Sequence, residues 1–298
     1  VQVEDELAAI GVAIGAGWSG ARAFTATSGP GVSLMTEFLG LAYFTEIPMV
    51  LVNVQRAGPS TGMPTRTQQS DILSCAYASH GDTKQILLFP DSPTECFKMG
   101  AQAFDIADVC QTPVIIMSDL DLGMNDHLTA EFNWQDEQAY QYGKLLNKEQ
   151  LDELKEFGRY LDVDGDGICY RTAPGTHPDK GAYFNRGTSR DHFARYTEKP
   201  EYYVDNVDRL QRKFVTALNY LPKPDIVQGK KSAKVALIYY GTTSHPITEA
   251  IDELKNHGIS VDTLRIKAFP FHDDIERFIS KHQDTFVIEQ NRDSQMKT

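Results

Sequence analysis

The feature that most constrains this chain is a regular alternation of short apolar runs with helical patterns over its first 118 residues. The apolar runs are strand-length and uninterrupted, as expected of strands buried on both faces. Strands are predicted at 22–27, 48–55, 85–89 and 113–118, and helices at 4–17, 33–44, 69–78 and 93–107. This order predicts an α/β fold in which helices cover both faces of a parallel sheet.

The alternation stops after residue 119 and resumes near the end of the chain. Residues 125–201 form a polar stretch with one charged helical piece at 148–157, and long irregular segments of this kind are usually functional. A helix at 204–220 comes next, and then strands at 235–240, 261–266 and 285–289 that alternate with helices at 247–257 and 273–282. We therefore predict two domains, residues 1–224 and residues 232–298, the second of them incomplete.

Charge and hydropathy exclude several classes of function. The chain has 29 basic and 41 acidic residues, a net charge of -12 that would repel a polyanion, so we expect no nucleic-acid partner. The apolar runs are far shorter than the roughly 20 residues that cross a bilayer. No basic segment followed by an apolar leader opens the sequence, so we expect a cytoplasmic chain without membrane contact.

The four cysteines lie far apart and form no Cys-x-x-Cys pair: Cys75, Cys96, Cys110 and Cys169. This spacing suggests neither a disulfide framework nor a ligand set for zinc or an iron–sulfur cluster. We expect most of these residues to be small and buried, and the chain itself to carry no cluster.

Residues 15–20 match the Gly-x-Gly-x-x-Gly spacing of the dinucleotide-binding fingerprint. That fingerprint lies between a strand and a helix, whereas here a predicted helix precedes it and a strand follows it. We interpret these glycines as the end of a helix, with left-handed conformations.

An acidic segment resembles the first half of a calcium-binding loop. Asp162, Asp164 and Asp166 take loop positions one, three and five, but the position that needs a bidentate Glu is Ala173. Two interpretations stay open, a structural divalent cation site and an acidic turn of the Asx type.

Two glycine-rich turns follow neighbouring predicted strands, TSGPG at 27–31 and QRAGPSTG at 55–62. Ligands of open parallel sheets usually bind where the carboxyl ends of such strands meet. Because the second turn carries Arg56, the pair predicts an anion pocket. Tight connections with a surface arginine are the alternative.

Longer segments carry a family resemblance. EDELAA at 4–9, AFTATSGPGVSLMTEF at 23–38 and VNVQRAGPSTGMPTRTQQSD at 52–71 closely resemble the alpha subunit of 2-oxoacid:ferredoxin oxidoreductases, above all the 2-oxoglutarate branch. Further matching segments are DVDGDGICYRT at 162–172, PGTHP at 174–178, YTE at 196–198 and VIEQNR at 287–292. The resemblance covers essentially the whole chain.

The resemblance implies a thiamine diphosphate pyrimidine-binding domain followed by a transketolase C-terminal-like domain. The implied reaction converts 2-oxoglutarate to succinyl-CoA and reduces ferredoxin, with coenzyme A as the acyl acceptor. The diphosphate, Mg²⁺ and a [4Fe-4S] cluster would be held by a separate beta subunit, in agreement with the cysteine spacing. The family's Tyr-Pro-Ile-Thr-Pro motif is absent from this sequence, so we expect an incomplete chain.

The resemblance also implies roles for single residues. Glu6 aligns with the carboxylate that hydrogen-bonds N1′ of the pyrimidine, with Glu4 as the alternative, although first-turn acids also suit the helix dipole. Arg56 aligns with the arginine that pairs with the 1-carboxylate of the substrate. Three further residues are expected to contact the cofactor: Ser28, Gly29 and Thr61.

The substrate stays open at this point. Arg66 is a candidate partner for a distal carboxylate, because it lies in the loop 62–71. A related subunit acting on pyruvate or branched-chain 2-oxo acids is an alternative, and so is a non-catalytic scaffold that only docks the beta subunit.

Overall fold

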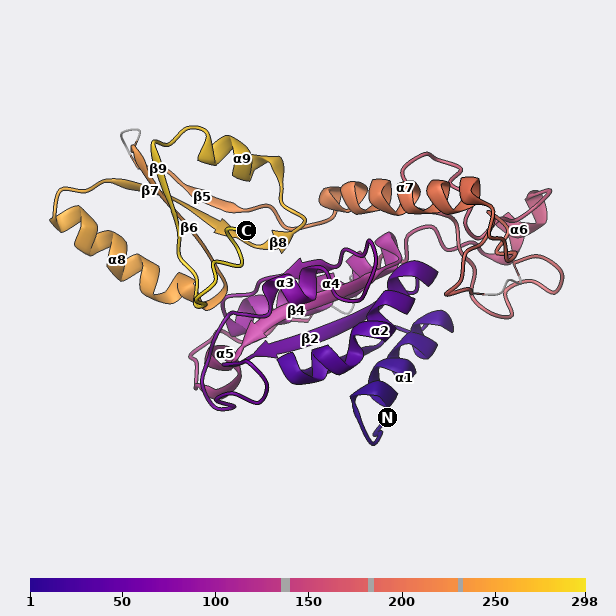
Figure 1. Ribbon diagram of the computed structural model, residues 1–298, viewed down its shortest axis with the longest axis horizontal. Coiled ribbons are helices and arrows are strands. Elements are labelled where there is room, and N and C mark those ends of the chain that lie inside the picture. The colour runs from indigo at the N-terminus through magenta and orange to yellow at the C-terminus, as the bar shows by residue number, and fades with distance from the viewer. Residues whose placement is uncertain (135–139, 182–184, 230–232) are drawn as a thin grey trace.

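The strands of this computed structural model form two sheets (Figure 1), and residues 1–134, 140–181, 185–229 and 233–298 are described. In the first sheet four parallel strands and one antiparallel strand have the order β1 (Phe24–Thr27), β2 (Met49–Gln55), β4 (Pro113–Asp119), β3 (Ile86–Leu88), β8 (Ala268–Phe269). In the second sheet the order is β5 (Asp225–Val227), β7 (Val261–Ile266), β6 (Val235–Tyr240), β9 (Asp284–Val287), with β5 antiparallel.

Helices cover both faces of the first sheet, as predicted. One face carries Leu51, Leu87 and Ile115 and packs against α1 (Glu6–Trp18), α2 (Gly29–Thr45) and α3 (Ile72–Ala76). The other face carries Val50, Ile86 and Val114 and packs against α4 (Pro93–Cys110) and α7 (Pro200–Thr216). The remaining helices are α5 (Leu120–Met124), α6 (Lys148–Glu153), α8 (Ser244–Asn256) and α9 (Asp273–Ile279), with 3-10 turns at Ala217–Asn219 and Gly241–Thr243.

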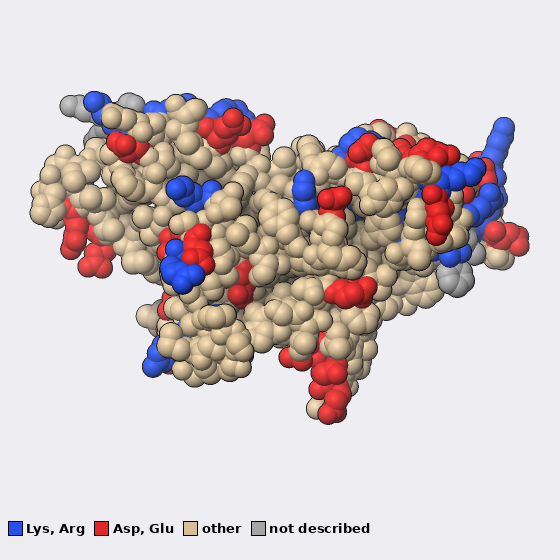
Figure 2. Space-filling view, in the orientation of Figure 1, with Lys and Arg blue, Asp and Glu red and all other residues tan. Residues whose placement is uncertain are grey.

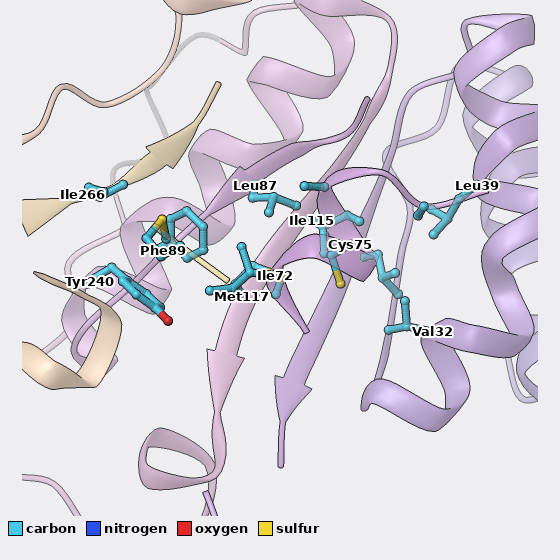
Figure 3. Packing of buried hydrophobic residues seen from close by; sticks show 14 of the residues in the cluster. Val32, Leu39, Ile72, Cys75, Leu87, Phe89, Ile115, Met117, Tyr240 and Ile266 are labelled. Carbon is cyan, nitrogen blue, oxygen red and sulfur yellow. The ribbon is translucent and has the colours of Figure 1, made fainter. Parts of the chain in front are cut away.

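The two sheets share one apolar core. Figure 3 shows Ile72, Phe89 and Met117 of the first sheet region beside Tyr240 and Ile266 of the second sheet. The rings of Phe89 and Tyr240 meet edge to face with centroids 5.4 Å apart. Since β8 also pairs with β3, the part of the chain after residue 225 is packed directly onto the first sheet.

The start of α2 depends on a glycine and a proline. A Cβ at Gly31 would lie 2.0 Å from Thr27 Oγ1 and 3.0 Å from Glu6 Cγ, so a larger residue would push α1 and β1 away from α2. Pro30 occupies the first turn, where its missing N–H costs no hydrogen bond. This helix begins four residues before the predicted residue 33.

The predicted strands are found, whereas several boundaries and short elements differ. The helix expected at 69–78 is reduced to α3, and β5, β8 and α5 were not predicted. Residues 15–20 are the end of α1 and the turn after it, with a helix before the glycines and strand β1 after them. Of these glycines only Gly20 has a positive φ, of 91°, so the left-handed conformation expected for them is wrong for Gly15 and Gly17, which lie within the helix. The dinucleotide fingerprint is therefore excluded, as expected. The predicted start of the second domain, residue 232, and parts of the polar stretch (135–139, 182–184) lie outside the described residues.

The polar stretch and α7 are attached to the sheet by buried charges around Glu46, which is 1% exposed. Its carboxylate accepts hydrogen bonds from Arg209 at 2.5 and 3.0 Å and from Lys213 at 2.9 Å, and Arg190 lies 3.6 Å away. Arg159 donates to the Glu46 carbonyl oxygen at 2.9 Å. Burial alone would raise the pKa of Glu46, but the charges of Arg209 and Lys213 hold it well below its usual value of 4.5.

Candidate active site

A cleft of about 670 Å³ lies at the carboxyl edge of the first sheet. It brings together the two glycine-rich turns predicted to form an anion pocket, represented by Gly29 and Arg56. Asp71 lines the same cleft, and the segment after β9 adds Asn291 and Arg292. Both sheets therefore contribute to this site.

Among the described residues that line the cleft, Arg56 is the cation without a protein partner. The side chain is half-buried, and its buried Nε donates no hydrogen bond to any part of the described chain. Its neighbours are fixed by hydrogen bonds from Ala57 N to Arg66 O at 2.8 Å and from Gly58 N to Gln68 Oε1 at 3.0 Å. A buried N–H of a guanidinium without a partner is costly, so this position is suited to an anionic ligand.

Asp71 is a site residue that the sequence analysis did not single out, although it ends the matching segment 52–71. Buried Asn53 donates to Asp71 Oδ2 at 3.1 Å, and the Asp71 backbone N–H donates to buried Gln55 at 3.2 Å. Burial raises the pKa of Asp71 above its usual value of 3.8, and the Asn53 hydrogen bond lowers it in part.

The segment after β9 holds the Asp71 strap, residues 69–73, in place. Asn291 Nδ2 donates to Gln69 O at 2.9 Å, and Gln69 N donates to Gln290 O at 3.0 Å. Gln295 donates to Ser70 O at 2.7 Å and accepts from Leu73 N at 3.2 Å. These contacts explain why residues 69–71 are not helical: their backbone groups bond to the second domain. The segment 287–292 carries part of the family resemblance, which by itself does not indicate this role.

Glu6 lies on the other side of the α2 start. It is the first residue of α1 and is half-buried, and its carboxylate forms no hydrogen bond or ion pair with the described residues. Asp5, the helix cap, accepts from Ala8 N at 2.8 Å, whereas Glu4 is exposed. Figure 2 shows acidic side chains gathered at this end of the chain. Glu6 therefore differs from both neighbouring acids by its position against Gly31.

The other residues that we predicted to contact cofactor or substrate are Ser28, Thr61 and Arg66. Ser28 is the cap residue of α2, where its side chain makes no capping hydrogen bond to the described helix. Thr61 and Arg66 are exposed and are not among the residues that line the cleft. Arg66 Nη1 instead donates to the carbonyl oxygen of Thr65 at 3.0 Å.

The acidic segment at 162–167 is satisfied internally. Lys144 Nζ lies 2.7 Å from Asp164 and 2.8 Å from Asp166, and Asp162 accepts from Gly165 N at 2.9 Å and Gly167 N at 3.0 Å. Across the described ranges, no cluster of three or more His, Cys, Asp or Glu residues is arranged to hold a metal. This geometry favours the acidic turn over the cation site.

Comparison with known proteins assigns the chain to a family. Residues 1–213 match the family model described as pyruvate flavodoxin/ferredoxin oxidoreductase, thiamine diphosphate-binding. The chain belongs to this family, so its first domain is a thiamine diphosphate-binding domain and the predicted resemblance is confirmed. In the described part of the chain, no helix is long and apolar enough to span a membrane.

Curated relatives are similar over nearly the whole chain. The alpha subunit of 2-oxoacid:ferredoxin oxidoreductase 2 from Aeropyrum pernix is 35% identical over 296 residues, which cover 98% of this chain and 45% of that protein. The 2-oxoglutarate synthase subunit KorA from Methanocaldococcus jannaschii is 32% identical over 291 residues, covering 92% and 71%.

A solved structure has the same fold. The 2-oxoglutarate:ferredoxin oxidoreductase from Magnetococcus marinus, with 2-oxoglutarate, coenzyme A and succinyl-CoA bound, superposes with a TM-score of 0.91 at 29% identity. The match covers 100% of this chain and 51% of that one. The chain thus spans about half the length of the Aeropyrum and Magnetococcus proteins.

Proposed function

We propose that the chain is the alpha subunit of a hetero-oligomeric, thiamine diphosphate-dependent 2-oxoacid:ferredoxin oxidoreductase that acts on 2-oxoglutarate. The observation that carries this proposal is Arg56, a half-buried cation whose Nε has no partner in the described chain, in a cleft built from both domains. Relatives named 2-oxoglutarate synthase support the choice of substrate.

The residues around the start of α2 fit the pyrimidine end of the cofactor. Glu6 supplies a carboxylate that the described chain leaves without a partner, as a contact with N1′ requires. Ser28 and Gly29 form the start of α2, the helix that Glu6 meets at Gly31, and Thr61 lies on the second glycine-rich turn. When bound, thiamine diphosphate supplies the reactive carbon for 2-oxo acid chemistry, and the protein supplies binding and orientation.

In this proposal the protein performs two tasks. Glu6 exchanges a proton with N1′, which sets the tautomer of the pyrimidine. Arg56 holds the 1-carboxylate of the substrate, because its planar guanidinium can donate two parallel hydrogen bonds to a carboxylate. Both side chains flank the first turn of α2, so cofactor and substrate would meet there.

We further propose that a beta subunit completes the enzyme. It would hold the diphosphate and Mg²⁺, and also a [4Fe-4S] cluster, for which the four cysteines of this chain lack the grouped spacing. Ferredoxin would take the electrons and coenzyme A the acyl group.

A broader substrate range is the second candidate. It is favoured by the relatives from Aeropyrum pernix and Saccharolobus solfataricus, whose names specify only a 2-oxo acid. Turnover of 2-oxoglutarate, pyruvate and a branched-chain 2-oxo acid by the reconstituted enzyme separates the two candidates. Binding of the beta subunit without turnover of any acid would instead identify a scaffold.

Glu6→Gln tests the proposal directly. Gln has nearly the volume of Glu and can still hydrogen-bond the pyrimidine, but it cannot exchange a proton with N1′. We expect turnover to fall by about 10²- to 10⁴-fold, the loss typical of a missing acid–base group, while the fold stays intact. Hydrogen–deuterium exchange at C2 of the bound cofactor measures the step.

Glu4→Gln is the matched control, because Glu4 is exposed and lies two residues away. Its exchange rate should equal that of the unmodified enzyme. A normal exchange rate in Glu6→Gln, or a larger defect in Glu4→Gln, would show that Glu6 is the wrong carboxylate.

A further inference from the structure

Asp71 is an acid inside a cleft that we propose for anions. Among the described residues that line the cleft it is the one half-buried carboxylate, since Asp293 is exposed and paired with Arg292 at 2.6 Å. Arg56 lines the same cleft. A cleft that we propose for negatively charged substrates thus contains a carboxylate of its own.

The position of Asp71 is fixed from several sides. Asn53, which is 0% exposed, donates to Oδ2, and Gln55, which is 1% exposed, accepts from the backbone N–H. Gln295 of the second domain bonds to Ser70, just before Asp71, and to Leu73, two residues after it. Two buried amides of strand β2 thus hold the carboxylate and the backbone N–H of Asp71, and the second domain holds its neighbours, which is more than the fold of a surface loop requires.

The carboxylate of Asp71 lies against the first residue of α2. A Cβ at Gly29 would be 2.8 Å from Asp71 Oδ2 and 3.1 Å from Oδ1, so only glycine leaves room for it. Glu6 contacts the same helix start at Gly31. The α2 end of the cleft therefore presents the carboxylate of Asp71, while Arg56 presents the cation.

We propose that Asp71 is a specificity-determining residue that keeps carboxylates out of the α2 end of the cleft, so that a 2-oxo acid binds in one orientation, with its 1-carboxylate at Arg56. This inference rests on the proposed function of Arg56. For a dicarboxylic acid, the second carboxylate would then be directed away from Asp71, and the exposed Arg292 that lines the same cleft is a cation that could receive it.

The charge of Asp71 depends on pH. Burial raises the pKa of Asp71, so its charge disappears at a higher pH than that of an exposed Asp. The thiol of Cys75, which accepts a hydrogen bond from the same Asn53 at 3.4 Å, stays neutral because burial raises its pKa to about 12. The other charged groups that face this end are Arg56, Arg292 and Asp293 from the cleft and Glu6 beyond Gly31. Repulsion of anions by Asp71 should therefore grow as the pH rises.

Asp71→Asn in the reconstituted enzyme gives a kinetic signature. Without the charge, the substrate also binds in unproductive orientations, which lowers kcat and KM together and leaves kcat/KM within about twofold. We expect each constant to fall by about 10-fold, the order of magnitude for like charges in a partly screened site. Asp71→Asn should fold, since the amide oxygen can still accept from Asn53. A purely structural role would instead raise KM, and an unchanged kcat would overturn the proposal.

Calorimetric binding of pyruvate to the enzyme over a pH series from 4 to 8 separates this inference from the proposed function. Binding to the unmodified protein should weaken as the pH rises and Asp71 becomes charged, whereas Asp71→Asn should bind about 10-fold more tightly than it at pH 8 and lose that dependence. Asp293→Asn, which removes an exposed charge of the same cleft, is the control and should change affinity less than about twofold.

Arg56→Lys serves as the reference variant. If it leaves pyruvate affinity unchanged, the proposed role of Arg56 fails. If it weakens binding while Asp71→Asn changes neither affinity nor pH dependence, the inference about Asp71 fails alone.

Discussion

The charged residues at the two ends of strand β2 differ in burial and in pairing. Before the strand, Glu46 is 1% exposed and is bound by Arg209 and Lys213. After the strand, Arg56 is half-buried and its Nε has no partner in the described chain. The seven-residue strand β2 thus separates Glu46, which has counter-ions within the protein, from Arg56, which has no partner in the described chain.

The difference teaches that burial of charge does not by itself mark a functional site. At the amino end, ions are paired and bonded to carbonyl oxygens, and the result is attachment of α7 and residues 159 and 190 to the sheet. At the carboxyl end, Arg56 has no hydrogen bond or ion pair with the described residues, and a cleft adjoins it. An incompletely paired buried group beside a cavity is the better indicator of ligand binding.

Glu46→Gln should have the largest effect on stability, because it leaves Arg209, Lys213 and Arg190 buried without their counter-ion. Breaking a buried pair by removing one partner typically costs about 3–5 kcal/mol. Urea unfolding of this chain measures the loss. Enzyme activity, where the variant folds, should change little, since Glu46 lies at the opposite end of β2 from the cleft.

The pH dependence of stability in acid gives an independent check of the ion cluster around Glu46. The fold holds the pKa of Glu46 well below its usual value of 4.5. The contribution of Glu46 to folding stability is therefore fully present above pH 4.5, and it is lost as the pH falls through the lower pKa of the folded state. Glu46→Gln should therefore show a shallower fall in stability below pH 4.5 than the unmodified chain. Parallel curves would mean that Glu46 is not the group that titrates.

Arg56→Lys should act in the opposite way, on activity and hardly on stability. Loss of a charged, bidentate hydrogen bond costs about 2 kcal/mol, which is roughly a 30-fold fall in kcat/KM. The fall should be similar for pyruvate and 2-oxoglutarate, since both have a 1-carboxylate. Impairment restricted to dicarboxylic acids would move Arg56 to the distal carboxylate, and a stability loss as large as that of Glu46→Gln would remove the contrast between the two ends.

The sequence predicts one of these two ends far better than the other. Strand β2 and the turn that carries Arg56 are local features, visible in an apolar run followed by Gly and Pro. The Glu46 cluster joins residues 163 and 167 positions apart, and its central residue has the left-handed φ of 60° that Gly or Asn usually adopts at a helix end, so no local pattern indicated it.

The candidate site was predictable only in part. Gly29 and Arg56 were expected together because neighbouring strand ends meet at one edge of a sheet, and they line one cleft. Asp71 and the helix boundary at 72 were not, since they depend on bonds from Asn291 and Gln295, more than 200 residues away. Contacts between domains decide these positions, and a single sequence carries no local signal for them.

The smallest expected effect concerns a third charged group, which resembles Glu46 in pairing but not in burial. Lys144 Nζ bridges Asp164 and Asp166 at 2.7 and 2.8 Å, at the place where a cation would sit in a calcium loop. Since the ammonium already neutralises these carboxylates, millimolar calcium should leave the melting temperature unchanged within about 1 °C. Lys144→Met, which removes the competing charge, should lower it only slightly, because partly exposed ion pairs contribute little. A rise in melting temperature of the unmodified chain with calcium would instead establish a cation site at Asp162, Asp164 and Asp166. A rise confined to Lys144→Met would show that the ammonium and the metal compete for one position, so that pairing decides whether acidic residues serve the fold or a ligand.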